Sequence, residues 1–497
     1  MSLQSRALHS LCDMKTREKY HQVRISHADG IDHAFDMLME ILKRPSLGQY
    51  VRHIDCRAHP LAYKDYVESK NIRQIKDEHM QLLENATRRA GFTGSQEGRI
   101  MNMLLQETTS DPVYIPYRDK PDTSGVFVPQ ALAALLISVS PNLDSMTLTL
   151  PFSGWSGLYW PELRGDIELI KFPLEQLLRE TNADPNDKPW LQNLRKIYIV
   201  NEANGVWDDE RFYHRMDFFG ALTLFDRLPS IESVGTDLLE WDDNGKQSLE
   251  LVSSSFSDIS INHASLSGLH LAQVICSCKA LRKFQFSIGG RATRDGGYPG
   301  FSAKTFIKAI LTHKETLEVL DMDIDSHIVG FTTGADEESL EYDFEMYDNR
   351  AEGEEDNAMP LPEAMWTQAG SLNDFRSLKR LSMGVGFLLY FAKGVMSVKG
   401  VSGEKVMLVD RLPENLEYLC IRGYEKGANP EHDNQIDALM ELVQMGSSKL
   451  KQVEGVDQLI PHGEDVDNPD NNPHLLWDPE GSRSESDLDE SETEDSG

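Results

Sequence analysis

The sequence predicts an α/β fold, an irregular horseshoe-shaped solenoid in which parallel strands line the concave face and helices lie outside. Two observations lead to this prediction. A short pattern of apolar residues recurs along almost the whole chain, and helical segments precede most of its copies. A coil that repeats helix, loop and strand stacks its units, and the strands then lie side by side and in parallel.

The recurring pattern is an apolar residue, two residues of any type, a second apolar residue, one residue, and a third apolar residue. The last two apolar residues are two apart, so they face the same side of a short strand. The residues between the three apolar positions point outward and are often charged or polar. Eight copies begin at Val51, Leu143, Leu194, Phe256, Leu281, Leu317, Leu378 and Leu416, and weaker copies begin at Ile231 and Leu450.

Helices are expected between these strands. In residues 32–43, apolar side chains recur at helical spacing, and Pro45 follows as a helix terminator. Residues 130–139 are apolar nearly all round, which is typical of a buried helix. The other expected helices are 269–278, 303–312 and 434–444, and a charged helical stretch is expected within 62–90.

The copies are unevenly spaced, which predicts insertions in the loops. Ile231, Phe256 and Leu281 follow one another at steps of 25 residues, whereas Leu378 lies 61 residues after Leu317. That long step contains the acidic segment 334–358, which we therefore expect to be an exposed loop insert of the solenoid at 31–461.

Acidic residues are concentrated in two segments of a chain whose net charge is −32. Residues 336–356 hold eleven acids and one arginine, and residues 464–495 hold thirteen acids and one arginine. No basic patch stands out, so neither nucleic acid nor an anionic membrane surface is expected as a partner. The chain has no run of 18 apolar residues, no signal-peptide pattern and only five cysteines, which indicates an intracellular protein of the cytoplasm, the nucleus or both.

The segment 462–497 is expected to be a disordered acidic tail, because it lacks apolar periodicity. Four serines in it each have an acidic residue three positions later, the pattern favoured by an acid-directed kinase such as casein kinase 2. Either these serines are phosphorylated or the tail only keeps the protein soluble. The candidate phosphorylation sites are Ser482, Ser484, Ser486 and Ser491.

No catalytic, cofactor or metal site is predicted. Asp321, Asp323 and Asp325 resemble the start of a calcium loop, but the glycine and glutamate that such a loop needs are absent, so outward polar strand residues are expected instead. The glycine-rich stretch 289–297 lacks the lysine motif of a phosphate loop. Cys276 and Cys278 have no second ligand pair at zinc spacing and are expected to be buried thiols. The protein is therefore not expected to be an enzyme.

These units resemble the repeat domains of fungal F-box and leucine-rich-repeat proteins. Residues 1–30, with Ala7–Cys12 and then Val23-Arg24-Ile25, resemble the last helix of an F-box and the strand after it. The rest of the F-box is absent from this sequence. The asparagine that follows the strand in such repeats is missing as well, and Gly289 and Asp325 stand near its place.

The resemblance implies a protein-binding scaffold, and specifically the substrate-recognition subunit of an SCF-type ubiquitin ligase, whose partners are a substrate protein and the ligase adaptor. The alternative is an acidic adaptor or chaperone-like protein that holds basic clients through its loop and tail. Residues between the apolar positions are the candidate protein contacts. They are Arg195, Lys196, Arg282, Lys283, Asp321, Asp323, Lys379 and Arg380.

Overall fold

Eleven parallel strands form one sheet in which the order of the strands follows the order of the chain. The computed structural model describes residues 14–25, 28–57, 73, 75–105, 128–149, 173–200, 213–242, 245–246, 248–289, 301–328, 361–395, 406–446 and 448–463. The strands of this sheet are β1 (Gln22–Arg24), β2 (His53–Cys56), β3 (Ser145–Thr149), β4 (Lys196–Val200), β6 (Ser233–Asp237), β8 (Asp258–Asn262), β9 (Lys283–Ser287), β10 (Val319–Asp323), β11 (Arg380–Gly384), β12 (Tyr418–Arg422) and β13 (Gln452–Glu454). The predicted α/β class and its parallel strands are confirmed.

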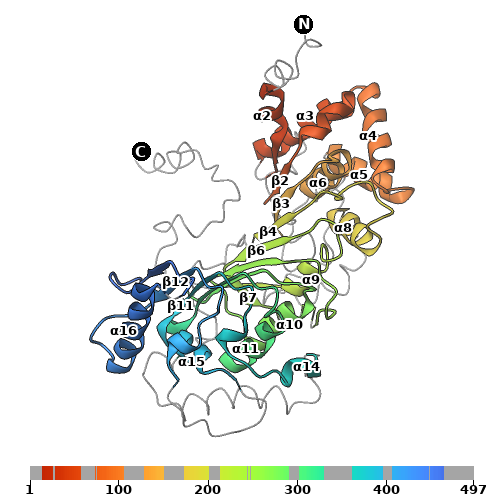
Figure 1. The fold of residues 1–497 in the computed structure, drawn as a ribbon. Helices are drawn as coiled ribbons and strands as arrows, with labels where there is room; N and C mark the ends of the chain where they lie inside the picture. Colours follow the sequence, from red (N-terminus) through yellow and green to blue (C-terminus); the bar gives the residue numbers. More distant parts are fainter. Residues whose placement is uncertain are drawn as a thin grey trace, which may run out of the picture.

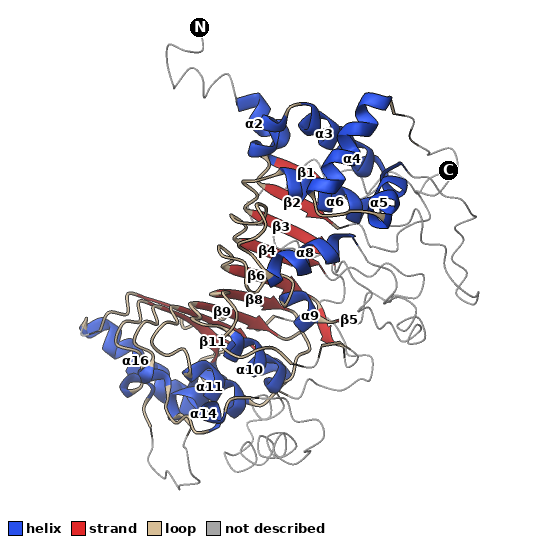
Figure 2. Ribbon diagram, turned by 90° about the vertical axis from the view of Figure 1, so that its right-hand side faces the viewer, coloured by secondary structure: helices blue, strands red, loops and turns tan. Residues whose placement is uncertain are grey.

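The helices follow the same side of the sheet along its length, and in the described part of the chain no helix covers the opposite face (Figures 1 and 2). Helix α2 precedes β1, and the other helices lie in the connections between strands, which parallel pairing requires to cross from one end of the sheet to the other. The helices are α2 (Met14–His21), α3 (Ala28–Lys43), α4 (Asp77–Arg89), α5 (Ser95–Leu105), α6 (Val128–Val139), α8 (Pro173–Ala183), α9 (Phe218–Leu222), α10 (Gly268–Ser277), α11 (Ala303–Leu311), α14 (Glu363–Trp366), α15 (Val385–Lys393) and α16 (Pro430–Met445).

Every copy of the apolar pattern forms a strand of this sheet, including the two weaker copies. In β10, for example, Leu320 and Met322 are fully buried against the helices. Val319 and Asp321, which alternate with them along the strand, are half-buried on the other side. The same alternation holds in β8 and β9. In β2 and β3 the outward residues are buried as well.

Neighbouring strands are held in the same register by one backbone hydrogen bond that recurs between equivalent residues just before each strand. The residue two positions before the central apolar residue of each strand donates its N–H to the carbonyl of the equivalent residue of the preceding strand, at 2.7–3.0 Å. We call these residues the leading row. They are His21, Arg52, Asp144, Arg195, Glu232, Ser257, Arg282, Glu318, Lys379, Glu417 and Lys451.

A single apolar core extends between sheet and helices from Tyr20 to Leu450. Its widest aromatic part lies under β9–β11. There the Phe306 ring lies 5.7 Å from the ring of Phe284, 5.8 Å from that of Phe301 and 6.0 Å from that of Phe387. Side chains from successive helices and strands thus fill one shared interior, which stabilises units that could not cover their apolar faces alone.

Buried His313 joins two neighbouring units within this core. Its Nε2 donates to the carbonyl of Ile275 at 2.9 Å, and its Nδ1 accepts from the N–H of Leu281 at 3.3 Å. Burial lowers the pKa of His313, so the ring is neutral and has one donor and one acceptor nitrogen. Both backbone groups are thereby satisfied without a charge in the core.

Some elements do not carry the recurring pattern. Strands β5 (His214–Met216) and β7 (Leu239–Trp241) form a separate two-stranded parallel sheet. Helix α15 starts directly after β11 and is one of several helices not expected from the sequence. Several expected features lie outside the described residues. They are the acidic segment 334–358, residues 62–72 and 74 of the expected helical stretch 62–90, and the serines Ser482, Ser484, Ser486 and Ser491.

Gly48 lies where no side chain fits. A Cβ atom at this buried position would lie 2.0 Å from the carbonyl oxygen of Val139, at the end of α6. We expect Gly48→Ala to lower the free energy of unfolding by about 1–3 kcal/mol, because backbone cannot move aside cheaply. Gly98, exposed in α5 with nothing within 4 Å of its Cβ position, is the matched control. Gly98→Ala should raise that free energy by about 0.5–1 kcal/mol in the same urea titration. Equal effects of the two changes would contradict this packing.

Candidate functional site

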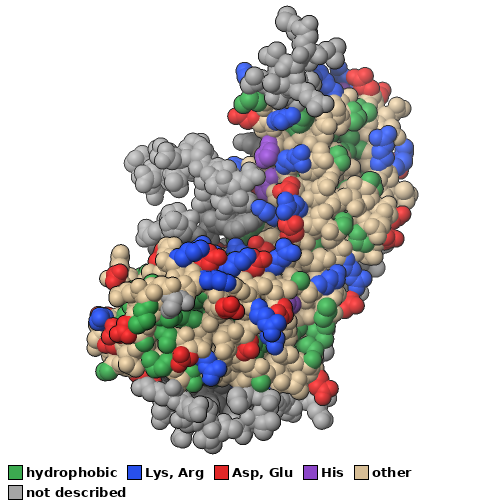
Figure 3. All heavy atoms as spheres, in the orientation of Figure 1, with side chains coloured by type: hydrophobic (Ala, Val, Ile, Leu, Met, Phe, Trp, Pro, Cys, Tyr) green, Lys and Arg blue, Asp and Glu red, His purple; other side chains and the backbone are tan. Residues whose placement is uncertain are grey.

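The face of the sheet that the described helices leave uncovered, which we call the outward face, carries most of the predicted contact residues. Charged side chains are frequent on the surface that Figure 3 shows, where Lys and Arg lie next to Asp and Glu in a band across the molecule. The predicted residues fall into two groups. One belongs to the leading row, at the start of the strands, and the other to the strands themselves.

Leading-row side chains alternate in charge and pair along the row. Arg195 lies 2.7 Å from Glu232, and Lys379 lies 2.7 Å from Glu318. The hydrogen bond from Lys379 lowers the pKa of Glu318, and the charge of Arg282 contributes in the same direction. These pairs are exposed, and such pairs contribute little stability. They hold Arg195, Arg282 and Lys379 next to acidic neighbours of the same chain.

Lys196, Lys283 and Arg380 follow the leading row at the first position of their strands. Lys196 and Arg380 are exposed, and the Arg380 guanidinium lies over the ring of Tyr418, 4.4 Å from its centroid. Lys283 is half-buried, and its Nζ lies 3.8 Å from a carboxylate oxygen of Asp258. The sheet therefore brings basic side chains to the outward face at strands β4, β9 and β11.

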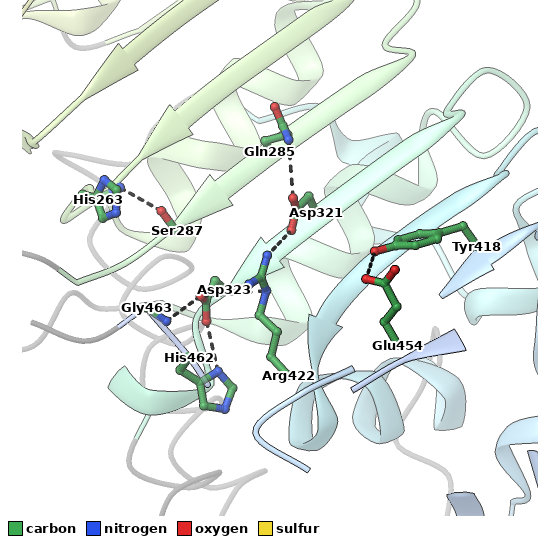
Figure 4. Close-up of polar contacts among 10 residues, drawn as sticks. All are labelled: His263, Gln285, Ser287, Asp321, Asp323, Tyr418, Arg422, Glu454, His462 and Gly463. Atoms are coloured by element: carbon green, nitrogen blue, oxygen red, sulfur yellow. Dashed lines mark hydrogen bonds and ion pairs between the residues drawn. The ribbon is translucent and has the colours of Figure 1, made fainter. Parts of the chain in front are cut away.

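Asp321 and Asp323 form a cluster with Arg422 that spans three strands (Figure 4). Arg422 on β12 reaches across β11, and its Nη2 lies 3.3 Å from Asp321 on β10 while its Nε lies 3.9 Å from Asp323. Small residues make this reach possible, because Ser382 and Gly384 are the outward residues of the intervening strand. The Nε2 of Gln285 also donates to Asp321, at 3.4 Å.

A segment after the last strand comes back onto this cluster. The carbonyl of Ile460 accepts a hydrogen bond from the N–H of Gly423 at 2.8 Å. The Nδ1 of His462 lies 3.0 Å from one carboxylate oxygen of Asp323, and the N–H of Gly463 donates to the other at 2.8 Å. We call residues 456–463 the strap. Two residues expected in the tail, His462 and Gly463, thus contact the fold, and the rest of the tail lies outside the described residues.

Charge pairing at the strap shifts the pKa of both partners. Burial would raise the pKa of Asp323, but the hydrogen bond with His462, the N–H of Gly463 and the charge of Arg422 together lower it. Burial would likewise lower the pKa of His462, but its hydrogen bond with Asp323 and the charges of Asp325 and Asp323 outweigh burial and raise it. The contact is therefore strongest when the imidazole is protonated and the carboxyl is ionised.

Asp325 corrects one expectation, since it is not a strand residue but lies in a short 3-10 helix (Asp325–His327) after β10. Its side chain is buried, and its carboxylate accepts a hydrogen bond from the N–H of Phe387 at 3.0 Å, in the first turn of α15. Gly384, the residue before α15, offers no capping side chain, and a Cβ there would meet the Asp325 carboxylate. Asp325 thus caps a helix of the next unit from the place of the missing asparagine. Burial raises its pKa to about 6.

The remaining motifs show no sign of reactivity. Cys276 and Cys278 are buried, as expected, and burial raises the pKa of both thiols to about 12. Among the described residues no group of three or more His, Cys, Asp or Glu side chains is arranged to hold a metal ion. Of the glycine-rich stretch, the structure describes only Gly289, whose backbone N–H and carbonyl both bond to the Tyr213 hydroxyl.

The sequence matches no protein-family model, and a search of curated proteins finds no match. None of the described helices combines the length and apolar character that crossing a bilayer requires.

Arg422, Ser382 and His462 were not among the predicted site residues. A signal for the first two exists in the sequence. Aligning the apolar copies places Asp321 and Ser382 in one column, and Asp323, Gly384 and Arg422 in another. Small residues between opposite charges in such a column indicate a side-chain contact across the middle strand.

Proposed function

We propose that this chain is an irregular solenoid of leucine-rich-repeat type that binds another protein on its outward face. The observation that carries the proposal is the uneven cover of the sheet, because the described helices lie on one of its faces (Figure 2). The other face carries polar and charged side chains in register on neighbouring strands, such as Asp323, Gly384 and Arg422. Parallel sheets are usually covered on both faces. Repeat proteins that leave the strand face open use it for binding.

The finer proposal is a substrate receptor of an SCF-type ubiquitin ligase. Its support is the resemblance of the first residues to the end of an F-box, together with the order of helix α2 and strand β1, which is the order that the resemblance implies. In this role the outward face holds the substrate, and the region before the solenoid contacts the adaptor.

Affinity purification from cells tests the binding face. The double substitution Lys196→Glu and Arg380→Glu reverses two exposed charges on the outward face. We expect partners that copurify with the wild type to be reduced about tenfold or more, since charge reversal at a binding face opposes the partner's charge pattern. The matched control is Arg89→Glu with Arg99→Glu, which makes the same charge change on the exposed helical surface of α4 and α5.

The outcomes separate the proposals. Partners that are lost equally from both double variants, or from neither, contradict the outward face as the binding surface. Recovery of the ubiquitin-ligase adaptor supports the receptor role, and its absence leaves only a protein-binding solenoid. Partners that disappear on deletion of residues 464–497, with binding that weakens steeply in salt, support the acidic adaptor instead.

A further inference from the structure

We infer that the outward face over β10–β12 is a docking site for an extended segment of a partner protein that carries a cationic side chain, and that the strap occupies this site until a partner replaces it. The inference rests on the proposed protein-binding function, and it specifies the place and the partner chemistry. The segment that docks presents a cationic side chain followed by a free backbone N–H, as His462 and Gly463 do (Figure 4).

Asp323 binds the strap through one side-chain contact and one backbone contact, the combination by which proteins often bind an extended peptide. One carboxylate oxygen takes the side chain of His462, and the other takes the backbone N–H of the next residue. Asp323 itself is only 8 % exposed. A buried carboxylate is costly unless it is paired, and without the strap only the more distant Arg422, at 3.9 Å, remains beside Asp323. A cation from a partner that takes the place of His462 therefore restores the closer pairing.

A second observation is that the site contains a buried polar group that its present contacts leave without a hydrogen bond. Ser382, the outward residue of β11 in register with Asp321 and Cys420, is 8 % exposed, and its Oγ has no hydrogen-bond partner. This hydroxyl lies on the floor between the acidic residues of β10 and Arg422 of β12. The hydroxyl is covered in the structure with the strap in place, and it would gain free energy from a hydrogen bond to a docked segment that reaches it.

The strap is held at few points, so it can be displaced. Its middle is exposed, with Leu459 50 % exposed. Its described anchors are Val456, which packs against the edge of the core, and the hydrogen bonds at Ile460, His462 and Gly463. Segments with few buried contacts open at low free-energy cost. The place where His462 docks is nevertheless specific, because the ring lies directly against Gly423, where a side chain would not fit. Gly423 has a φ of 68°, and a Cβ atom there would lie 2.1 Å from the His462 ring.

The test uses the full-length protein and a labelled synthetic peptide of residues 456–463, acetylated at its N-terminus and amidated at its C-terminus. In the wild type the tethered strap competes at high effective concentration, so little peptide binds. His462→Asp in the protein places a carboxylate against Asp323 and releases the strap, and His462→Ala removes the cation without adding charge. We expect fluorescence anisotropy to show at least tenfold tighter peptide binding to both variants.

Two further arms test the chemistry. Adding Asp323→Asn to the His462→Asp protein should weaken the peptide about tenfold or more, because a hydrogen bond between charged groups is lost. A peptide with lysine in place of the histidine should still bind, and one with glutamate should not. As the pH rises through the pKa of His462, which faces Asp323, Asp325 and Arg422, the histidine peptide should weaken and the lysine peptide should not.

His33→Asp, the same change at an exposed position of α3, is the control and should bind the peptide no better than the wild type. Circular dichroism checks that each variant is folded. The inference is overturned if no variant binds the peptide, if wild type and His462→Asp bind it equally, or if Asp323→Asn has no effect. Because this assay needs no natural partner, its failure is distinct from failure of the copurification experiment.

Discussion

Replacing Phe306 by alanine is expected to lower the free energy of unfolding by about 3–5 kcal/mol. The ring is fully buried among three other phenylalanine rings, which come from strand β9, from Phe301 just before α11, and from α15. Removing it leaves a cavity shared by three consecutive units, which a core at crystal-like density can close only in part. Urea unfolding followed by circular dichroism measures the change.

Met445→Ala is the control for Phe306→Ala, because Met445 is 75 % exposed at the end of α16. Its effect should stay within about 0.5 kcal/mol. A loss below about 1 kcal/mol for Phe306→Ala would mean that these units do not share one interior, and the continuous core would then be wrong.

Asp325→Asn is expected to stabilise the protein above neutral pH by up to about 3 kcal/mol. The pKa of Asp325 is raised from 3.8 to about 6, so the folded state binds its proton more tightly than the unfolded state. Stability from this group is therefore present at low pH and lost as the pH rises from about 4 to 6, at 1.36 kcal/mol for each unit of pKa shift. Asparagine stays neutral and still offers an oxygen to the N–H of Phe387.

Urea titrations at pH 4 and pH 8 test this expectation. The difference between Asp325→Asn and wild type should be near zero at pH 4 and largest at pH 8. Asp325→Ala is the control, since it removes both the charge and the acceptor. It should be less stable than Asp325→Asn at both pH values, because the Phe387 N–H is left unpaired. Destabilisation by Asp325→Asn at pH 8 would show that the ionised carboxylate is favoured in the fold.

Strands could be predicted well from the sequence because their signal is local. Two apolar residues two apart, after a third, occur at every strand of the main sheet from β2 to β12 except β6, whereas β6 and β13 keep only the first two apolar residues. Tertiary packing does not override this signal. Helix α15 could not be predicted in the same way. Its sequence is apolar on most sides, so it shows little periodicity, and its cap, Asp325, lies 60 residues before its first residue. Strands β5 and β7 are too short to show alternation.

The candidate site was only partly predictable. Asp321 and Asp323 were expected on the outward face because they alternate with buried apolar residues. The strap was not expected, because a polar segment without periodicity has the composition of a tail whether or not it docks. Only the structure shows that His462 and Gly463 meet a carboxylate 139 residues earlier in the chain.

The alternating signs of the leading row constrain how this architecture can grow or shrink. From Arg282 to Lys451, each residue of the leading row has the opposite charge to the next one in the row. A unit in this stretch therefore has favourable charge contacts only with neighbours whose leading-row residue has the opposite sign. Excision of the unit that carries Glu318, Lys379 or Glu417 would set two like charges side by side, whereas excision of two neighbouring units among them would restore the alternation. Gain or loss of units in pairs therefore leaves the charge alternation intact in this stretch. Gain or loss of a single unit brings like charges together where the remaining units meet.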